Sequence, residues 1–191
     1  RENFSFCGQL LSKREFTEKN LNKGELRPEV AYLMCCYANI QPEDVVLEPF
    51  AGYGSIPIQI SKHFKYGKLF VSDIDSERIA DLRQKKHLKK ENVFIEECSV
   101  FDLPTKRSEI SCVITDPPWG YFEEIADITK FYVDMFESFR QICRENCKIV
   151  ILTARVENFI QAAENSNVKL TNRINTLING KKASLFKCEL M

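Results

Sequence analysis

The sequence has no excess of charge of either sign and no long apolar run, and each absence excludes a class of protein. Its 191 residues include 27 Lys plus Arg and 27 Asp plus Glu, so the formal net charge is zero. Domains that bind nucleic acid tightly by themselves usually carry a basic excess, so a nucleic-acid partner is expected to need help from another domain. No stretch approaches the roughly 18 consecutive apolar residues of a transmembrane helix, so no membrane partner is expected.

Metal-ligand spacing is also lacking. There are only two histidines, and the eight cysteines are scattered along the chain. Cys143 and Cys147 lie four positions apart, but no second Cys or His pair stands at the spacing of a zinc site. We therefore expect no metal. We interpret the cysteines as free thiols, several of them buried, in a reducing compartment such as the cytoplasm.

Short apolar runs that alternate with amphipathic stretches predict an α/β fold with a mostly parallel sheet. The predicted strands are 45–50, 68–73, 92–97, 110–116 and 147–154. The predicted helices are 28–38, a helix that ends near 63, 76–90, 123–146 and 156–166. Pro28 suits the first turn of the first helix, and Ser76 is the expected N-cap of the third.

The tail after residue 166 predicts an antiparallel hairpin. It contains Asn179-Gly180, a dipeptide that strongly favours a two-residue hairpin turn. Five β/α units followed by this hairpin form one domain, which we assign to residues 28–191. Residues 1–27 are polar and mixed in character, so we assign them to an N-terminal extension without a predicted structure.

A glycine-rich turn follows the first predicted strand, in VLEPFAGYGSIPIQI. Gly52 and Gly54 allow a ligand to approach the backbone closely, and the following helix offers free N–H groups. The turn lacks the Gly-Lys-Ser/Thr ending of a phosphate-binding loop, and Pro57 stands where a dinucleotide fingerprint has its third small residue. Asp73 ends the second strand, where a carboxylate can accept both hydroxyls of a ribose. Asp75 is the alternative, although the position suits a helix cap better, and a turn that merely connects strand to helix is the structural alternative.

The stretch TDPPWG ends the fourth predicted strand. Two prolines cannot continue a central strand, so the loop offers acceptors only: the Asp116 carboxylate and the carbonyls of Pro117 and Pro118. An amino group complements these acceptors, and Trp119 offers a flat surface on which a base can stack, worth about 1–3 kcal/mol. Alternatively, Asp116 caps a turn and Trp119 is a core residue. If the first and fourth strands are neighbours at the switch point of the sheet, this loop and the glycine turn face one crevice.

The segments EPFAGYGS, SDID and DPPWG, in this order and spacing, resemble the class I S-adenosylmethionine-dependent methyltransferases that act on exocyclic amino groups. With LRPEVAYLM ahead of them, they are similar to the catalytic domain of THUMP-associated RNA guanine-N2 methyltransferases. The resemblance covers roughly residues 25–190. It implies a Rossmann-like fold, with a seven-stranded, mostly parallel sheet and an antiparallel C-terminal β-hairpin strand, and it implies S-adenosyl-L-methionine as the cofactor.

The same resemblance assigns roles to individual residues. The implied cofactor-binding set is Glu48, Pro49, Phe50, Ala51, Gly52, Gly54, Asp73, Ile74, Ser99, Val100 and Asp116, and the implied catalytic set is Asp116, Pro117, Pro118 and Trp119. Gly52 and Gly54 would line the methionine end of the cofactor, and Glu48 would help to orient it. Asp73 would hold the ribose, and Ile74 would flank the adenine.

At the acceptor side, the resemblance implies that Asp116 and Pro117 hold the amino group opposite the sulfonium methyl, with Trp119 against the base. One position departs from the family pattern. An Asp often follows the third strand and binds the adenine amino group, but this sequence has Ser99 there, with Asp102 three positions later. The contact with adenine is therefore expected to differ.

The implied activity is direct, in-line methyl transfer to N2 of guanine in RNA, in tRNA or rRNA, with an upstream RNA-binding domain helping to capture the substrate. Positioning and the acceptors that stabilise charge on the amine would supply the catalysis, without a covalent enzyme intermediate. Cys98 and Cys112 are interpreted as core residues of the third and fourth strands. The alternatives are methylation of adenine N6 in RNA or DNA, methylation of glutamine N5 in a protein, and a cofactor-binding interaction domain without catalysis.

Overall fold

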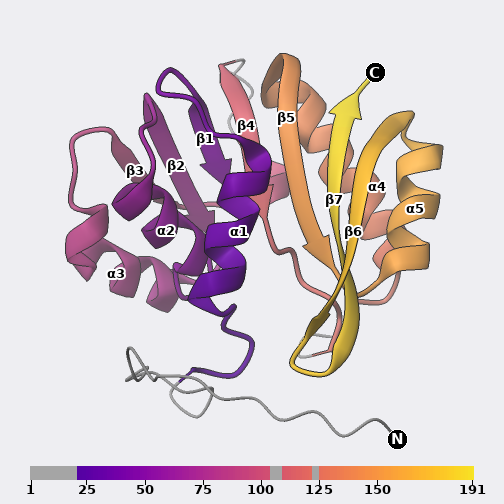
Figure 1. Cartoon of the computed structure of the whole chain (residues 1–191), viewed down its shortest axis with the longest axis horizontal. Coiled ribbons are helices and arrows are strands. Elements are labelled where there is room, and N and C mark those ends of the chain that lie inside the picture. The colour runs from indigo at the N-terminus through magenta and orange to yellow at the C-terminus, as the bar shows by residue number, and fades with distance from the viewer. Residues whose placement is uncertain (1–20, 104–108, 122–124) are drawn as a thin grey trace, which may run out of the picture.

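The computed structural model describes residues 21–103, 109–121 and 125–191, which form a seven-stranded sheet with helices on both faces (Figure 1). The strand order is β3-β2-β1-β4-β5-β7-β6. Strands β1 to β5 are parallel, β7 is antiparallel to β5, and β6 is antiparallel to β7. The sequence-based expectation of a Rossmann-like sheet with an antiparallel C-terminal strand is confirmed.

The strands are β1 Val45–Glu48, β2 Lys68–Asp73, β3 Val93–Glu97, β4 Ile110–Thr115, β5 Cys143–Thr153, β6 Val168–Ile178 and β7 Lys181–Leu190. The helices are α1 Pro28–Ala38, α2 Ser55–His63, α3 Ser76–Gln84, α4 Ile128–Ile142 and α5 Val156–Asn165, with 3-10 turns η2 Lys86–Leu88 and η3 Val100–Asp102. Every predicted strand and helix is present, and the differences lie at the ends of the elements. Within the described part of the chain, no helix combines the length and the apolar character that a membrane span requires.

Helix α3 departs from the prediction at both ends. Its N-cap is Asp75 rather than Ser76, because the Asp75 carboxylate accepts hydrogen bonds from the amides of Glu77 and Arg78. The helix stops at Gln84, six residues before the predicted end, because the 3-10 turn η2 turns Leu88 into the core, where it is 2% exposed.

Two further boundaries differ from the prediction. Helix α4 begins at Ile128 with Asp127 as its cap, and residues 123 and 124 of the predicted helix lie outside the described residues. Strand β5 begins at Cys143, earlier than predicted, because Cys143 already pairs with Ile110 of β4. The register then shifts, so that the next paired residue, Lys148, faces Cys112.

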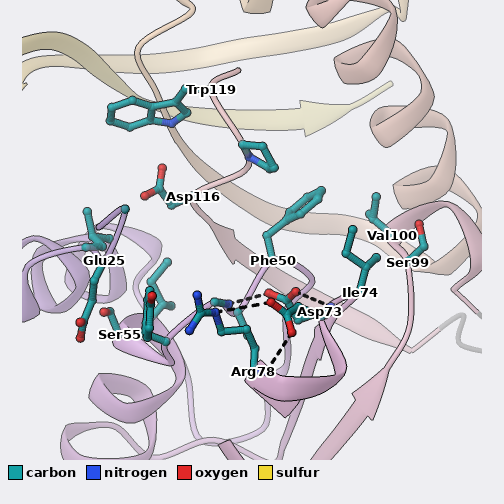
Figure 2. A pocket seen from close by; sticks show the side chains of 18 of the residues that line it. Glu25, Phe50, Ser55, Asp73, Ile74, Arg78, Ser99, Val100, Asp116 and Trp119 are labelled. Carbon is teal, nitrogen blue, oxygen red and sulfur yellow. Dashed lines mark hydrogen bonds and ion pairs between the residues drawn. The ribbon is translucent and has the colours of Figure 1, made fainter. Parts of the chain in front are cut away.

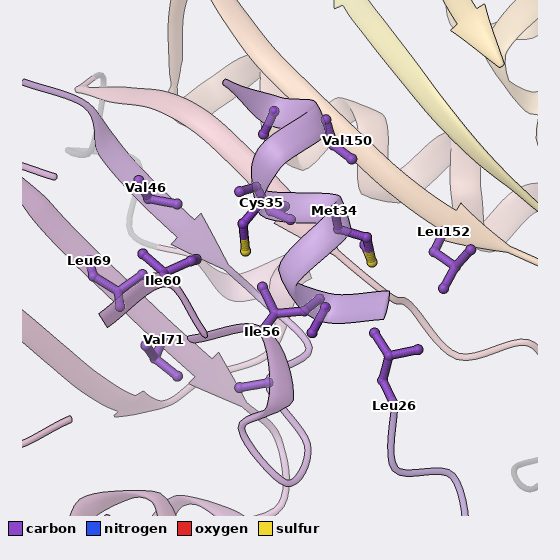
Figure 3. Packing of buried hydrophobic residues seen from close by; sticks show 14 of the residues in the cluster. Leu26, Met34, Cys35, Val46, Ile56, Ile60, Leu69, Val71, Val150 and Leu152 are labelled. Carbon is purple, nitrogen blue, oxygen red and sulfur yellow. The ribbon is translucent and has the colours of Figure 1, made fainter. Parts of the chain in front are cut away.

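Residues on the central strands alternate between two buried faces, as expected for a sheet covered on both sides. Val46 belongs to the hydrophobic cluster under α1, α2 and α3, whereas the next residue, Leu47, belongs to the cluster under α4 and α5. Figure 3 shows the first cluster, in which Met34 and Cys35 of α1 lie against the strands and are fully buried. The two layers of helices therefore fix the orientation of every strand that ends at the site.

The cysteines of the described residues are free thiols, and four of them are buried: Cys35, Cys112, Cys147 and Cys188. Cys112 is a core residue of β4, as predicted. The prediction for Cys98 is wrong in its position, because this residue lies one place beyond β3 and is half-buried against the core.

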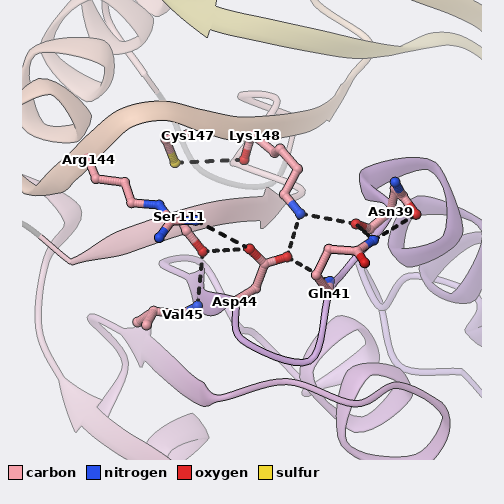
Figure 4. A network of polar contacts seen from close by, with 8 residues as sticks. All are labelled: Asn39, Gln41, Asp44, Val45, Ser111, Arg144, Cys147 and Lys148. Carbon is pink, nitrogen blue, oxygen red and sulfur yellow. Dashed lines mark hydrogen bonds and ion pairs between the residues drawn. The ribbon is translucent and has the colours of Figure 1, made fainter.

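A buried polar network holds the amino-terminal edge of the sheet together (Figure 4). Its centre is Asp44, which is 2% exposed and accepts hydrogen bonds from the Gln41 amide at 2.7 Å and the Ser111 hydroxyl at 2.7 Å. The Lys148 ammonium also donates to this carboxylate. Burial opposes ionisation of Asp44, but hydrogen bonds from Lys148, Gln41 and Ser111 outweigh it and lower the pKa of the carboxyl below its usual value. The network joins β1, β4 and β5 at their amino-terminal ends, opposite to the loops that follow these strands.

Candidate active site

A cavity of about 660 Å³ opens at the carboxyl ends of β1, β2 and β4, where the strand order reverses. Open α/β sheets bind their ligands at this place, and the volume lies within the range of about 300–1,000 Å³ typical of ligand pockets. The predicted residues that line it are Phe50, Ala51, Gly52, Asp73, Ile74, Ser99, Val100, Asp116, Pro118 and Trp119. Glu48, Pro49, Gly54 and Pro117 are not part of its wall. The glycine turn and the proline loop thus face one cavity (Figure 2).

The glycine turn follows β1 and has two left-handed residues, Gly52 at φ 51° and Gly54 at φ 89°. A Cβ on Gly52 would meet no atom within 4 Å, so its backbone borders open space. A Cβ on Gly54 would lie 2.5 Å from a side-chain carbon of Leu82, so this glycine lets α2 approach α3. Gly52 therefore serves the cavity, whereas Gly54 serves the packing behind it. Pro57 lies in the first turn of α2, as expected.

Asp73 ends β2 and fixes the two loops beside it. Its Oδ2 accepts a hydrogen bond from the Gly52 amide at 2.7 Å, and its Oδ1 accepts one from the Asp75 amide at 3.0 Å. A carboxylate has about four lone-pair directions, so both oxygens can still accept from a ligand hydroxyl. The next residue, Ile74, lines the cavity with 67% of its surface exposed, which leaves an apolar side chain ready to cover a planar group.

Glu48 lies behind the cavity wall and is fully buried. Its Oε1 accepts hydrogen bonds from the Phe50 amide at 3.0 Å and the Thr115 hydroxyl at 2.6 Å, while Oε2 has no partner in the described residues. Burial raises the pKa of this carboxyl well above its usual value. The two hydrogen bonds offset part of the rise, and the charges of Asp116 and Asp73 add to it. Glu48 therefore ties the end of β4 to the loop after β1.

Asp116 follows β4 and reaches the cavity from the opposite side to Asp73 (Figure 2). Its Oδ1 is buried and has no hydrogen-bond partner in the described residues. Burial raises the pKa of this carboxyl to about 7, and the nearby indole of Trp119 offsets part of the rise. The indole N–H does not complete a hydrogen bond of normal geometry, since Trp119 Nε1 is itself buried without a partner. An acceptor without a donor at the wall of a cavity is suited to an N–H group of a ligand.

Trp119 combines the two interpretations that the sequence left open. One part of the side chain packs against the hydrophobic cluster under α1, and another part lines the cavity. Its backbone carbonyl accepts a 2.6 Å hydrogen bond from Nε of Arg155, the second residue after β5. The proline loop is therefore anchored at two places, by β4, which precedes it, and by Arg155, which follows β5.

Several residues of the cavity wall were not predicted. Phe101 is 48% exposed and forms an edge contact with Phe131 of α4, with ring centroids 5.6 Å apart. The Arg78 guanidinium lies 3.7 Å from the ring centre of Tyr53, and all four residues line the cavity. Aromatic residues next to the predicted Ser99-Val100 pair and next to Gly52 were the available signal for Phe101 and Tyr53, whereas Phe131 and Arg78 depend on how helices dock.

Residues 23–26, which the predicted boundary placed in the N-terminal extension, also belong to the cavity wall. Leu26 is 7% exposed and is part of the core cluster under α1. The described structure thus continues the domain ahead of Pro28. The segment has neither helical nor strand periodicity, so the predicted boundary stood at Pro28, although the family resemblance already began near residue 25.

The fold and this site define a class I S-adenosylmethionine-dependent methyltransferase. A family model described as the RMKL-like methyltransferase domain matches residues 14–183. The chain belongs to this family, and S-adenosyl-L-methionine is its cofactor. Three features of the wall fit that molecule: the open space at Gly52, the acceptor oxygens of Asp73 and the exposed apolar Ile74. Within the described residues, no group of three or more His, Cys, Asp or Glu side chains could hold a metal ion.

Relatives of known name are similar to parts of the chain. A Bos taurus protein named U6 snRNA (guanine-N(2))-methyltransferase THUMPD2 is 31% identical over 137 residues, which cover 66% of this chain and 25% of that protein. The chain thus spans about a quarter of the length of this curated relative.

Solved structures share the fold. TrmN from Thermus thermophilus has a TM-score of 0.76 at 19% identity, over 88% of this chain and 50% of that one. A putative RNA methyltransferase, PH1948 from Pyrococcus horikoshii, has a TM-score of 0.63 at 18% identity, over 85% and 82% of the two chains. A geranyl diphosphate methyltransferase in complex with SAM has a TM-score of 0.68 at 11% identity, over 86% and 85%.

Proposed function

We propose that this chain transfers a methyl group from S-adenosylmethionine to N2 of guanine in RNA. The observation that carries the proposal is the unpaired, buried Oδ1 of Asp116 in the cavity that also contains Gly52 and Asp73. Guanine as the acceptor is supported by the resemblance to THUMP-associated enzymes and by the name of the bovine relative. That name makes U6 snRNA the first RNA to test, ahead of the tRNA and rRNA that the sequence alone favoured.

The residues divide into a cofactor side and an acceptor side. On the cofactor side, Gly52 offers its bare backbone, Asp73 holds the ribose, and Ile74 covers the adenine. Ser99 and Val100 also line the cavity and lie near Ile74 (Figure 2), an arrangement that suits a contact with the adenine edge. Phe50 and Ala51 complete the wall after β1, and Pro49, Gly54 and Glu48 support this wall from behind.

On the acceptor side, the Asp116 carboxylate and the carbonyl of Pro117 accept the two N–H bonds of the amino group, and Pro118 closes the loop. Trp119 stacks against the base. Bound S-adenosylmethionine supplies an electrophilic methyl group on its sulfonium sulfur. Asp116 aims the nitrogen lone pair at that methyl and stabilises the positive charge that develops on the nitrogen. Because the pKa of Asp116 is about 7, its carboxylate can then accept the amine proton that N-methylation releases.

RNA capture is proposed to need a further segment. The chain carries no net charge, and specific RNA binders usually have a basic surface. The curated relative is about four times as long as the matched part, which leaves room for an RNA-binding domain. A target base in a loop or a single strand suits the site better than a paired one, because a paired base has to be flipped out at a cost of a few kcal/mol.

The test uses this chain, labelled S-adenosylmethionine and a U6 snRNA transcript at a concentration high enough to replace a separate RNA-binding segment, followed by digestion to nucleosides. We expect N2-methylguanosine from the wild type. Asp116→Ala is expected to lose at least about 100-fold in kcat, because it removes an acceptor that acts on the developing charge. The affinity of this variant for the cofactor is expected to stay within about threefold of the wild type, because the proposed contacts to the cofactor's ribose and methionine parts come from Asp73 and Gly52.

Other products separate the alternatives. N6-methyladenosine as the product would show that the acceptor is adenine rather than guanine. Methyl label on glutamine of a protein fraction would exclude a nucleobase as the acceptor. Cofactor binding without transfer to any RNA, DNA or protein fraction would support the non-catalytic domain. An Asp116→Ala variant as active as the wild type would remove Asp116 from the mechanism.

A further inference from the structure

Two cations converge on one exposed aromatic ring beside the proline loop. The Lys181 ammonium lies 3.5 Å from the ring centre of Tyr121, and the Arg155 guanidinium carbon lies 4.5 Å from it. Tyr121 is 43% exposed, and its ring centre is 6.3 Å from that of Trp119. Tyr121, Arg155 and Lys181 do not line the cavity, whereas Trp119 does. They form a separate cationic rim at its acceptor end.

The rim is assembled from three distant parts of the chain. Tyr121 belongs to the loop after β4, Arg155 follows β5, and Lys181 is the first residue of β7. The β6–β7 hairpin extends beyond the carboxyl end of β5 and brings Lys181 to this edge of the sheet (Figure 1). Its turn has two residues with positive φ, Asn179 at 49° and Gly180 at 79°, as a tight two-residue hairpin requires.

Arg155 is the fixed member of the rim. Its amide donates to the Thr153 hydroxyl at 2.9 Å, and its Nε donates to the Trp119 carbonyl at 2.6 Å. Among residues 21–103, 109–121 and 125–191, no carboxylate forms an ion pair with this guanidinium. Its terminal nitrogens therefore keep their donors while the side chain is already ordered, an arrangement that suits a phosphate.

We infer that Arg155 and Lys181 bind the backbone phosphate next to the target nucleotide of an RNA strand, with Tyr121 as the platform between them. This rests on the proposed function, because it takes the base to lie against Trp119. If the target base stacks on Trp119, the phosphates of that nucleotide lie within one nucleotide's length of the Trp119 ring. The Tyr121 ring is next to Trp119 and is therefore within reach of these phosphates. The rim thus selects a polynucleotide over a free nucleoside.

The experiment compares three lysine variants of the 191-residue chain. Lys181→Met keeps the apolar stem and removes the charge, and Lys181→Arg keeps both charge and ring contact. Lys169→Met is the control, since Lys169 is an exposed lysine of the same hairpin that lies at its opposite end and pairs weakly with Glu189 at 3.4 Å. The probes are a short single-stranded oligoribonucleotide that contains guanine and the same oligomer with neutral methylphosphonate linkages.

We expect Lys181→Met to weaken oligoribonucleotide binding about three- to tenfold at low salt and to reduce the slope of log K against log salt by about 0.7, the value for one phosphate contact on a single strand. Lys181→Arg restores both quantities, and Lys169→Met changes neither. The methylphosphonate oligomer binds the wild type and Lys181→Met equally. In methyl transfer, Lys181→Met raises KM for the oligoribonucleotide more than it lowers kcat, and it leaves the affinity for S-adenosylmethionine as in the wild type.

Equal slopes for the wild type and Lys181→Met would overturn the inference, as would equal losses in Lys181→Met and Lys169→Met, or a wild type that does not bind the oligoribonucleotide. The proposed function fails separately. If the wild type methylates no RNA but the salt slopes differ as expected, the rim binds phosphate and only the reaction is wrong.

Discussion

The amide of Gly52 donates a 2.7 Å hydrogen bond to Oδ2 of Asp73, 21 residues later, and so joins the two loops that hold the cofactor side of the cavity. Asp73→Ala removes both this bond and the proposed ribose contact. We expect S-adenosylmethionine affinity to fall by at least about tenfold, since two hydrogen bonds to a charged acceptor are lost. Isothermal titration calorimetry measures it.

Asp75 is the matched control for that prediction, because it is the adjacent carboxylate of the same loop. It caps α3 through the amides of Glu77 and Arg78. Asp75→Ala is expected to lower the free energy of unfolding by about 1 kcal/mol and to leave cofactor affinity within about twofold. A larger loss of affinity in Asp75→Ala than in Asp73→Ala would move the ribose contact to Asp75.

Substitutions of the two glycines of the turn are expected to have different effects, one on stability and the other on cofactor binding. A Cβ on Gly54 collides with buried Leu82 at 2.5 Å, so Gly54→Ala should lower the free energy of unfolding by about 2–4 kcal/mol through strain and overpacking. Gly52→Ala has room for its Cβ, so it should lower the free energy of unfolding by only about 1 kcal/mol, the cost of left-handed backbone strain. The added methyl group enters the cavity, however, so cofactor affinity should fall by more than this small loss of stability would cause. Chemical denaturation and calorimetry on both variants test this, and the same ranking of the two variants in both measurements would contradict it.

Asp116 predicts a pH dependence of stability with an unusual sign. Burial raises its pKa in the folded protein to about 7, above the value of about 3.9 in an unfolded chain. The folded state therefore binds more protons than the unfolded state between these values, and this group destabilises the fold as pH rises through the window. Asp116→Asn should be more stable than the wild type by about 1–3 kcal/mol near pH 8. The difference should shrink to near zero by about pH 4.

The same carboxyl should appear in the kinetics. Methyl transfer needs Asp116 as an acceptor, so kcat/KM of the wild type should rise with pH through about 7 and level off above it, because kcat/KM reports the free enzyme. Asp116→Asn is expected to retain little activity and no such rise. A wild-type profile that is flat between about pH 6 and 8 would contradict the assignment.

Asp44 predicts the opposite behaviour at the other edge of the sheet. Hydrogen bonds from Lys148, Gln41 and Ser111 lower its pKa despite burial, so its contribution is present above the unfolded value of about 3.9 and is lost as pH falls below it. Asp44→Ala should lower the free energy of unfolding by about 2–4 kcal/mol at neutral pH, because Lys148 is partly buried and loses the carboxylate that neutralises it, keeping only the Asn39 carbonyl as an acceptor. Urea denaturation at neutral and acidic pH measures both effects. Cofactor affinity, which depends on the opposite edge, serves as the control.

The sequence was informative wherever the signal is local. Short apolar runs that alternate with amphipathic stretches predicted the order of strands and helices, and Asn179-Gly180 predicted the hairpin, because each signal depends on neighbours in the chain. The residues at the ends of β1, β2 and β4 reach one cavity because parallel strands end at the same edge. The error at Ser76 and Asp75 was one position, since both residue types are good caps and only the geometry of the loop after β2 selects between them.

What the sequence did not indicate depends on long-range packing. Phe131 reaches the cavity because α4 packs against β5 and against the η3 turn, which also lines the cavity. The bond from Arg155 to the Trp119 carbonyl spans 36 positions and involves a backbone acceptor that any residue provides. Leu26 and its neighbours close the cavity without any periodic pattern of their own.

The position of residues 23–26 in the cavity wall has a practical consequence for handling the protein. A shortened version of the chain must keep these residues, because a chain that starts at Pro28 would lack this part of the cavity wall. Met191 follows β7, which runs antiparallel to β5 and ends at the opposite end of the sheet from the cavity (Figure 1), so a tag attached there stays away from the reaction.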